Sequence, residues 1–335
     1  MNRPPEEFRR VDEMRLIRFI TECFCRSGLD EEHAQLISRL LVNNDLRGVR
    51  SHASRSAGGY CNGFVEGHLN PQPDLRIVVE TDALAVFDGD GTLGYLPMVR
   101  AAEAAVAKAR VQGIGAGLVR HIGHYGSSGH YTRICVEADC VGYSVQGYRG
   151  EAEPKSPPRS AADSGNPPVS FAIPAGDESP IVLDAGAAFD SPFPVEGFEE
   201  MAHRHPAPFF KSMGMIAVST MIGGTLTGFL GPEGDRIAAQ WPGARMGGTI
   251  IALDPQRLGC ADEFRADVDR YVRDIRQDHT PLPGTDRALL PGAIEAERFR
   301  QYRQAGIPLG DREQVSMRSM SERFDVPLPW DEEGS

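Results

Sequence analysis

At both ends of the chain, apolar residues recur three and four positions apart, and this spacing predicts amphipathic helices. Residues 11–28, VDEMRLIRFITECFCRSG, follow it and end at Gly28, a residue typical of helix C-termini. Asp30 is expected to cap a second helix, EEHAQLISRLLVNNDLRG, which ends near Gly48. Three more segments near the C-terminus predict helices: CADEFRADVDRYVRDIRQ, AIEAERFRQYRQAG and PLGDREQVSMRSMSERF.

The middle of the chain has a different pattern, with short β-branched runs between Gly and Pro residues that predict strands. These runs are RIVVET, ALAVFD, GAGLVR, VGYSVQG, VSFAIP, PIVLDAG and GTIIALDP. LPMVRAAEAAVAKARVQG, closed by Gly113, predicts an amphipathic helix, and the apolar segment 212–231 is expected to form a buried helix. The Pro/Ser-rich stretch 151–166 is expected to be an exposed loop.

This organisation predicts an α/β (α+β) fold in which both termini join in one helical domain. We assign residues 1–70 and 262–335 to that domain, which carries His52, and residues 71–261 to a central sheet-containing domain that binds a cofactor.

Composition narrows the function classes. With 47 acidic and 35 basic residues and a formal net charge of −12, the chain lacks the basic character of nucleic-acid-binding proteins. It has neither an apolar run of transmembrane length nor a signal peptide, so we expect a cytoplasmic protein with no membrane partner. The six cysteines form no CxxC pair and no zinc-finger spacing, so free thiols and no metal site are expected.

A GxGxxG pattern follows one predicted strand, within the segment from Asp88 to Gly94. In this context it is typical of a dinucleotide-binding turn, and Arg120, after the next strand, imitates the arginine that receives a 2′-phosphate. The carboxylates of Asp88 and Asp90 would, however, repel a pyrophosphate. We interpret the segment as a tight turn that caps a helix.

The segment DLRGVRSH is a better candidate for chemistry, because His52 follows a predicted helix end among small and polar residues. An imidazole there is suited to proton transfer near neutral pH, and Ser51 is placed to orient it. The alternative is an exposed loop histidine without a role.

A second segment, HIGHYGSSGH, carries His121, His124 and His130 after a predicted strand. Their spacing matches no common zinc pattern, so proton transfer is the functional interpretation. A helix-entry loop capped by Ser127 or Ser128 is the structural alternative, and both interpretations can hold together.

The order of these motifs resembles the malate/L-lactate dehydrogenase family that does not use a Rossmann fold. The series runs through DLRGVRSH, GDGTLGY, HIGHYGSSGHY, GNPPVSFAIP, PIVLDAG, LTGFLG, GGTIIALDP, LLPG and AGIPLG, over about residues 10–329. The resemblance implies a homodimer that uses NAD or NADP, with a non-Rossmann cofactor domain built on a mixed or antiparallel sheet. It also implies an active site at the domain and subunit interface.

Roles carry over by position. His52 matches the proton donor and acceptor of the family, and His124 matches its second active-site histidine. Within the cofactor segment, Lys211 is expected to meet a phosphate or ribose oxygen. The positions that match cofactor-lining residues are Pro180, Ile181, Val182, Leu183, Asp184, Ala185, Gly186, Phe210, Lys211 and Gly292.

The sequence departs from the family at the substrate clamp. Family members read SHGxxR, but here Ala53 replaces the glycine and Ser56 replaces the arginine that holds a substrate carboxylate. Arg55 is one residue early, which corresponds to about 100° of rotation on a helix. Arg55, Ser56 and Arg120 are therefore the candidates for substrate binding, and the acidic residue after the C-terminal glycine is displaced to Glu295.

The predicted activity is hydride transfer between NAD(P)H and the carbonyl carbon of a 2-oxo acid, or a cyclic imine carbon, of a small-molecule substrate. His52 would supply the proton, His124 would polarise or anchor the oxygen, and Ser51 would orient His52. The alternative is a non-redox enzyme on the same scaffold, such as a lyase, cyclase or isomerase, that keeps the histidines with an altered clamp. A third interpretation is a non-catalytic dimer that binds a small molecule.

Overall fold

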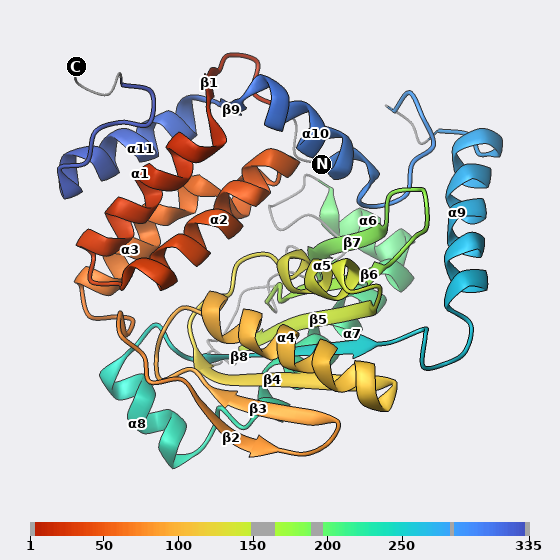
Figure 1. The fold of residues 1–335 in the computed structure, drawn as a ribbon, viewed down its shortest axis with the longest axis horizontal. Coiled ribbons are helices and arrows are strands. Elements are labelled where there is room, and N and C mark those ends of the chain that lie inside the picture. Colours follow the sequence, from red (N-terminus) through yellow and green to blue (C-terminus); the bar gives the residue numbers. More distant parts are fainter. Residues whose placement is uncertain (1–3, 149–164, 189–196, 282–284, 332–335) are drawn as a thin grey trace.

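The computed structural model describes residues 4–148, 165–188, 197–281 and 285–331, which form a helical layer beside a seven-stranded sheet (Figure 1). Of the stretch predicted as an exposed Pro/Ser-rich loop, only residues 165 and 166 lie within the described ranges.

Segments from both ends of the chain build the helical layer. Its first strand pairs antiparallel with a strand near the C-terminus, Arg10 opposite Pro308, and the two ends share a core that includes Phe24, Leu41 and Met317. The elements are β1 (Arg9–Val11), α1 (Glu13–Arg26), α2 (Glu31–Arg47), α3 (Ala57–Val65), α10 (Ala293–Ala305), β9 (Ile307–Leu309) and α11 (Asp311–Phe324).

The two predicted N-terminal helices are confirmed, and local chemistry explains where they begin and end. The side chain of Asp12 accepts a hydrogen bond from the backbone N–H of Met14 at 2.9 Å, and Asp30 accepts one from His33 at 2.8 Å. Gly48 ends α2 in the left-handed conformation, at φ 73°.

The sheet has the strand order β2-β3-β4-β8-β5-β6-β7. β3 and β4 run parallel, and every other neighbouring pair of the described strands is antiparallel, which confirms the expected mixed sheet. All seven predicted runs form strands: β2 (Arg76–Glu80), β3 (Leu84–Asp88), β4 (Ile114–Ile122), β5 (Val141–Tyr148), β6 (Pro168–Ile173), β7 (Ile181–Gly186) and β8 (Met246–Leu253).

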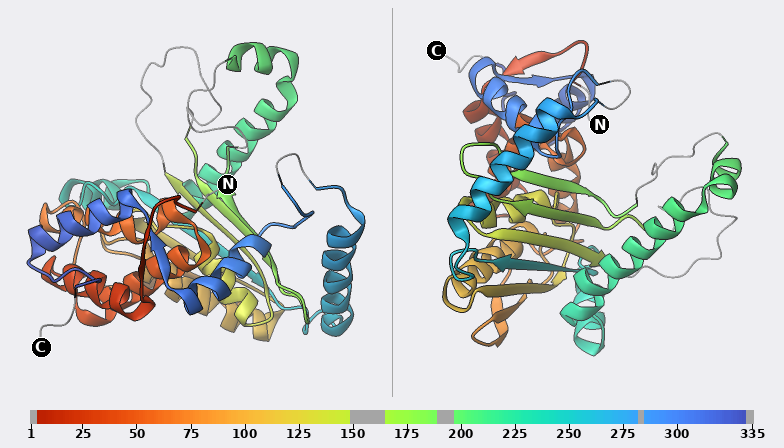
Figure 2. Two further views of the ribbon diagram at one scale, coloured as in Figure 1. Left: turned by 90° about the horizontal axis from the view of Figure 1, so that it is seen from above. Right: turned by 90° about the vertical axis from the view of Figure 1, so that its right-hand side faces the viewer.

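Helices cover both faces of the sheet, as two adjacent glycines of β8 show. A Cβ atom at Gly248 would lie 2.5 Å from the sulfur of Met98 on α4, whereas one at Gly247 would lie 2.2 Å from Oγ1 of Thr227, just beyond α7. Successive strand residues face opposite sides, so α4 and α7 pack on opposite faces (Figure 2). The helices around the sheet are α4 (Tyr95–Gln112), α5 (Gly129–Glu137), α6 (Phe198–Arg204), α7 (Pro206–Gly223), α8 (Pro232–Gln240) and α9 (Ala261–Asp278).

The prediction of a buried helix over residues 212–231 is wrong. The helix, α7, begins at Pro206 and ends at Gly223, and only its last turns pack on the sheet, where Gly223 lets the backbone approach β5. The remainder extends away from the sheet (Figure 2) and leaves Phe210 73% and Val218 52% exposed. Within the described ranges, residues Pro206–Thr227 are also the one helix whose length and composition would suit a membrane span, which is weak evidence by itself.

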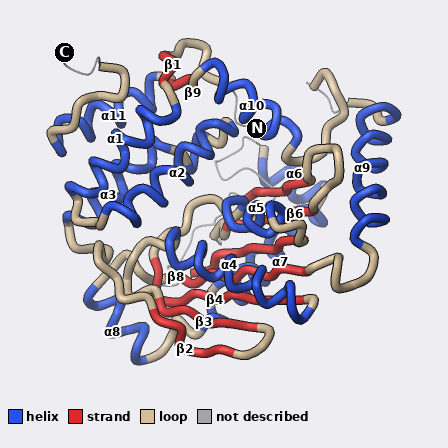
Figure 3. Tube along the Cα trace, in the orientation of Figure 1, coloured by secondary structure: helices blue, strands red, loops and turns tan. Residues whose placement is uncertain are grey.

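The last helix before the C-terminal part of the helical layer, α9, stands beside the sheet (Figure 3). The buried carboxylate of Asp269 accepts hydrogen bonds from the backbone N–H groups of Gly176, Asp177 and Glu178 at 2.8–3.1 Å. This contact joins α9 to the loop between β6 and β7. The division into two domains at residues 70/71 and 261/262 stays a prediction.

All six cysteines are free thiols, as predicted.

Candidate active site

His52 ends a short 3-10 turn, η1 (Arg50–His52), that follows α2 in the helical layer. Two buried side chains of α2 hold this segment. Asn44 Nδ2 donates to the carbonyl oxygen of His52 at 2.8 Å, and Asp45 Oδ2 accepts from the backbone N–H of Ser54 at 3.0 Å. Ser51 Oγ lies 2.9 Å from His52 Nδ1, the position expected for a residue that orients the ring.

The same segment is fixed to the C-terminal helix α11. Arg50 donates to both carboxylate oxygens of Glu313, whose side chain is 1% exposed, with Nε at 3.0 Å from Oε1. Glu313 also accepts from the backbone N–H of Gly310 at 3.1 Å. The ion pair therefore connects the His52 segment to the other end of the chain, with good geometry and satisfied carboxylate oxygens.

His124 lies in the loop between β4 and α5, and its ring stacks on that of His52. The ring centroids are 5.5 Å apart and the planes differ by 21°. The structure thus brings together the two histidines that the sequence singled out, one from the helical layer and one from the sheet.

Two donors fix the proton position on His124. The backbone N–H of Gly126 donates to Nδ1 at 3.2 Å, so Nδ1 carries a lone pair and the hydroxyl of Tyr60, at 2.8 Å, must also donate to it. The proton of the neutral ring is therefore on Nε2. Tyr60 in turn accepts from the hydroxyl of Tyr95 at 3.4 Å.

Burial sets the charge of both rings. It lowers the pKa of His52 below its usual 6.5, against the opposing effect of the negative charge of Asp184. For His124, burial and the neighbouring His52 lower the pKa to about 4. Both imidazoles are therefore neutral in most molecules at pH 7, and His52 is in the form that accepts a proton.

The other two histidines of the second segment have supporting roles. His130 is buried in the first turn of α5, and its Nε2 accepts from Asn44 Nδ2 at 3.2 Å, the amide that also holds His52. His121 is buried, and its Nδ1 lies 2.9 Å from Asp88 Oδ2. Ser128 is the N-cap residue of α5, although its side chain makes no capping hydrogen bond.

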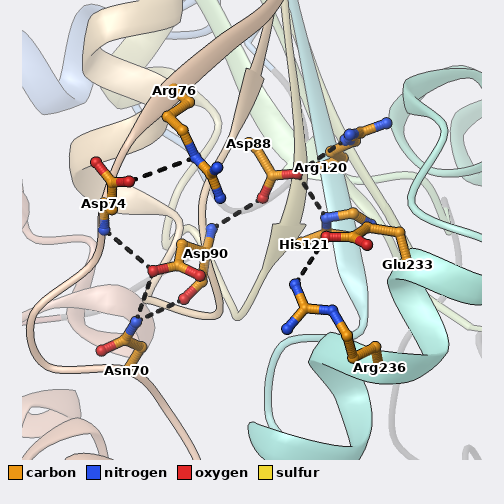
Figure 4. A network of polar contacts seen from close by, with 9 residues as sticks. All are labelled: Asn70, Asp74, Arg76, Asp88, Asp90, Arg120, His121, Glu233 and Arg236. Carbon is orange, nitrogen blue, oxygen red and sulfur yellow. Dashed lines mark hydrogen bonds and ion pairs between the residues drawn. The ribbon is translucent and has the colours of Figure 1, made fainter.

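The GDGTLG segment forms a tight turn between β3 and α4, as interpreted from the sequence, and belongs to a polar network (Figure 4). Asp88 accepts from Arg120 Nε at 3.1 Å as well as from His121. A Cβ atom at Gly91 would lie 2.2 Å from Cδ1 of Trp241, so the space at this turn is filled by the protein itself. The network ties Arg120 to Asp88 rather than to the histidine pair.

The central part of the predicted cofactor segment lines a cavity of about 810 Å³. Val182, Leu183 and Asp184 of β7 line it together with Gly292 and Arg133. Asp184 also accepts a hydrogen bond from the hydroxyl of Ser127, in the loop that carries His124. This hydrogen bond links the cavity wall to the loop of His124, although neither histidine lines the cavity.

The remaining predicted residues lie elsewhere. Pro180 and Ile181 line a second cavity, of about 290 Å³, which shares Pro291 and five other lining residues with the first. Phe210 and Lys211 lie on the exposed part of α7 and line neither cavity.

The clamp candidates Arg55 and Ser56 lie in a second 3-10 turn, η2 (Ser54–Ser56). Ser56 Oγ donates to the Ser51 carbonyl oxygen at 3.3 Å, and the Arg55 carbonyl oxygen accepts from Ser316 of α11. Ala185 and Gly186 end β7, where a Cβ at Gly186 would lie 2.2 Å from Asn166.

Sequence reasoning missed three residues of this site: Asn44, Tyr60 and Arg133. Asn44 lies on the buried face of α2, and a polar residue at the helical spacing of that face signals a buried hydrogen bond. Tyr60 and Arg133 lie on helices and contact the site only through the packing of distant elements. Their local sequence carries no such signal.

A family model described as malate/L-lactate dehydrogenase matches residues 11–190 and 194–318. The chain belongs to this family. The resemblance inferred from the motif order is confirmed, and with it the assignment to a family of dehydrogenase enzymes.

Relatives of this chain are named as dehydrogenases of malate, L-sulfolactate and ureidoglycolate. A malate dehydrogenase of Pyrococcus horikoshii is 33% identical over 53% of this chain, a match that spans about half of that relative (49%). An L-sulfolactate dehydrogenase of Methanocaldococcus jannaschii is 26% identical over 87% of this chain and 90% of its own. An NAD⁺-dependent ureidoglycolate dehydrogenase of Escherichia coli O157:H7 is 23% identical over 90% and 93%.

Solved structures confirm the fold. Malate dehydrogenase from Pyrococcus horikoshii superposes with a TM-score of 0.82 at 23% identity, over 98% of this chain and 99% of its own. Malate dehydrogenase from Entamoeba histolytica superposes with a TM-score of 0.79 at 21% identity, over 97% and 100%. The mixed sheet and its helices are therefore the fold of this dehydrogenase family.

Proposed function

We propose that this protein is an oxidoreductase that uses NAD or NADP and transfers a hydride to or from the carbonyl carbon of a 2-oxo acid, or a cyclic imine carbon, with His52 as the general acid and base. The observation that carries the proposal is the stacked pair of His52 and His124, which Ser127 and Asp184 link to a cavity lined by the predicted cofactor segment. Family membership supports hydride-transfer chemistry over the lyase, cyclase or isomerase alternative.

The cavity suits a nicotinamide dinucleotide. Its volume of about 810 Å³ is in the upper part of the range found for ligand pockets. Gly292, at φ 95°, borders it where a Cβ atom would lie 2.9 Å from the backbone nitrogen of Val182, so only glycine allows this approach of the loop to β7. Val182, Leu183, Asp184 and Gly292 would hold the cofactor, which supplies or accepts the hydride.

His52 is the residue placed for proton transfer. Ser51 Oγ engages Nδ1, and among the described residues nothing engages Nε2, so Nε2 is the atom that would give a proton to the forming alkoxide or take one from a hydroxyl. His124 presents its Nε2–H as a hydrogen-bond donor, because Tyr60 and Gly126 occupy Nδ1. That donor would polarise the substrate oxygen and hold it near His52.

A second copy of the chain is proposed to cover α7. Its exposed apolar side chains, among them Phe210, Val218 and Met221, would otherwise remain in water. In a homodimer, α7 would place Phe210 and Lys211 at the subunit interface, where the family resemblance implies the active site. Both would then contact the cofactor in the cavity of the partner subunit. Val218→Glu should convert the dimer to a monomer in sedimentation experiments, and a wild-type chain that sediments as a monomer would refute the dimer.

The function is tested by turnover of a panel of 2-oxo acids and cyclic imines with NADH and NADPH, followed by nicotinamide absorbance. His52→Ala should lower turnover on whichever substrate is found by about 10²–10⁴-fold. The matched control is His68→Ala, because His68 is an exposed histidine outside the site. Wild-type turnover by the His52 variant would remove the acid–base assignment.

A further inference from the structure

One arginine in the wall of the cavity belongs to none of the roles assigned above. Arg133 lies on α5, four residues after Gly129, and lines the cavity. It is not one of the arginines expected to clamp the substrate. Arg55 is one residue away from the clamp position, and Arg120 is bound by Asp88. Arg55, whose charge acts on His52, is the competing candidate for a substrate carboxylate.

The start of α5 is shaped to receive the Arg133 guanidinium. A Cβ atom at Gly129 would lie 2.5 Å from Arg133 Nη1 and 2.4 Å from Asp184 Oδ2. Both charged groups therefore occupy the space that any other residue at 129 would fill. The guanidinium is held at the junction of α5 and β7, next to the predicted cofactor segment.

This guanidinium has charge neighbours but no direct partner. Asp184, Glu295 and Glu137 lie close enough to favour its charged form, and burial disfavours it, so that the pKa of Arg133 is lowered overall. Yet among the residues that the structure describes, none forms an ion pair within 4.0 Å or a hydrogen bond with the Arg133 side chain. Asp184 is instead engaged by Ser127. Arg133 is half-buried in the cavity wall, and its N–H donors have no partner within the described protein, so they are available to a ligand in the cavity.

A second arginine lies close to Arg133, and two glutamates act on both. Arg47 of α2 lies over the ring of Phe299 at 4.5 Å, and its Nε is buried without a hydrogen-bond partner. Burial and then the charge of Arg133 lower the pKa of Arg47 to about 9. Arg47 and Arg133 repel each other, and the carboxylates of Glu137 and Glu295 offset part of this repulsion. Arg133 is the one of the two that lines the cavity, where its unused N–H donors could donate to an oxyanion.

The position of this pair relative to the catalytic histidine fits a substrate. Arg133, Arg47 and His52 all lie near enough to His130 to act on its charge, and His130 shares Asn44 with the His52 segment. An anion held by Arg133 would therefore lie near the proton-transfer group.

We infer that Arg133 binds the carboxylate of the substrate and takes the place of the arginine that is absent at Ser56. The inference rests on the proposed oxidoreductase function. The same chemistry would also suit a phosphate of the cofactor, so the experiment has one arm for each anion.

Calorimetric titration of the full-length protein tests this, with sodium oxalate as the carboxylate probe, inorganic phosphate as the phosphate probe, and NADH and NADPH as separate arms. The variants are Arg133→Gln, Arg133→Lys and Arg55→Gln, and Arg318→Gln is the control, since Arg318 is an exposed arginine on α11. Loss of a charge-assisted, two-pronged contact should weaken oxalate binding about tenfold or more in Arg133→Gln. Arg133→Lys should recover only part of it. Affinity for the nicotinamide cofactor should change less than about twofold by the same reasoning.

Thermal unfolding separates ligand binding from a structural role. If Arg133 merely stabilised the fold, Arg133→Gln would lower the midpoint without ligand. We expect a midpoint at least as high as that of the wild type, because an incompletely paired buried charge is removed. Oxalate should raise the midpoint of the wild type and not that of the variant.

The outcomes below would overturn either the assignment of Arg133 or the proposed redox function. Unchanged oxalate affinity in Arg133→Gln, loss of oxalate binding in Arg55→Gln alone, or no oxalate binding by the wild type would overturn the assignment. Weaker NADH or phosphate binding with oxalate unaffected would also overturn it and assign Arg133 to the cofactor. Absence of NADH and NADPH binding, with oxalate still dependent on Arg133, would refute the redox function and leave the anion site.

Discussion

Acidification should destabilise this protein through histidines that are buried in the neutral form, and His124 gives the clearest case. Its pKa is about 4 in the folded protein, lowered from the usual 6.5 by burial and by His52. The unfolded chain therefore binds a proton between these values that the folded protein does not. Stability from this residue is fully present above pH 6.5 and is lost as the pH falls toward 4.

The size of the effect follows from the two pKa values. At pH 5 the linkage amounts to about 2 kcal/mol less stability than at pH 8 for this one residue. His33, buried in the helical layer with a pKa of about 4 for the same reason of burial, should add a comparable amount. Together the two histidines should lower stability by about 4 kcal/mol between pH 8 and pH 5, and the raised pKa of Asp45 opposes them over the same interval.

His124→Asn isolates the contribution of His124. The asparagine oxygen is two bonds from Cβ, like Nδ1, so it can still accept from Gly126 and Tyr60, but it does not titrate. Urea unfolding at pH 5, 6, 7 and 8 should show a pH-dependent loss that is smaller by about 2 kcal/mol in the variant. His68→Asn, at an exposed position, is the control and should follow the wild type. Parallel pH profiles for His124→Asn and the wild type would refute the reasoning.

Three further substitutions test how the site is held. Gly129→Ala should lower stability by about 1–3 kcal/mol because the added Cβ meets two charged side chains, whereas Gly59→Ala, with open space around it in α3, should be neutral or slightly stabilising in the same melts. Arg50→Met should lower the free energy of unfolding in urea by about 3–5 kcal/mol, because it leaves Glu313 buried and unpaired. Adding Glu313→Gln to this variant should recover part of the lost stability. An Arg50→Met variant as stable as the wild type would contradict the role of the ion pair. Burial raises the pKa of Asp45 to about 7, so the free energy of unfolding falls as the pH rises from 4 to 7. Asp45→Asn should therefore be more stable than the wild type by about 2–4 kcal/mol at pH 8 and by less at pH 5. A larger gain at pH 5 than at pH 8 would contradict the pKa shift.

Much of the fold could be predicted because its signals are local. Helix caps such as Asp12 and Asp30, the closing glycine at 48 and the β-branched runs of the sheet act within a few residues. The pairing of His52 with His124 was accessible only through the family resemblance. They are 72 positions apart in the printed sequence, and no local rule places them in contact.

The errors and omissions have a common physical cause, which is dependence on distant packing. The apolar spacing of α7 is the same whether its partner is the sheet or a second chain, so the pattern could not show that Phe210 is exposed. The sequence suggests Arg120 as a phosphate or substrate ligand because it does not show that Asp88 lies opposite Arg120 across the parallel pair β3 and β4. Nothing in the local sequence distinguishes Arg133 from an ordinary helical arginine, because its place in the cavity wall depends on how α5 packs.

The central claim, that this chain is a nicotinamide-dependent oxidoreductase, is tested most directly by titrating the purified protein with NADH and NADPH. Nicotinamide fluorescence follows the binding, and calorimetry confirms it. The account predicts saturable binding of at least one cofactor in the micromolar range, corresponding to about −8 kcal/mol. Absence of binding to either cofactor up to millimolar concentration would contradict it.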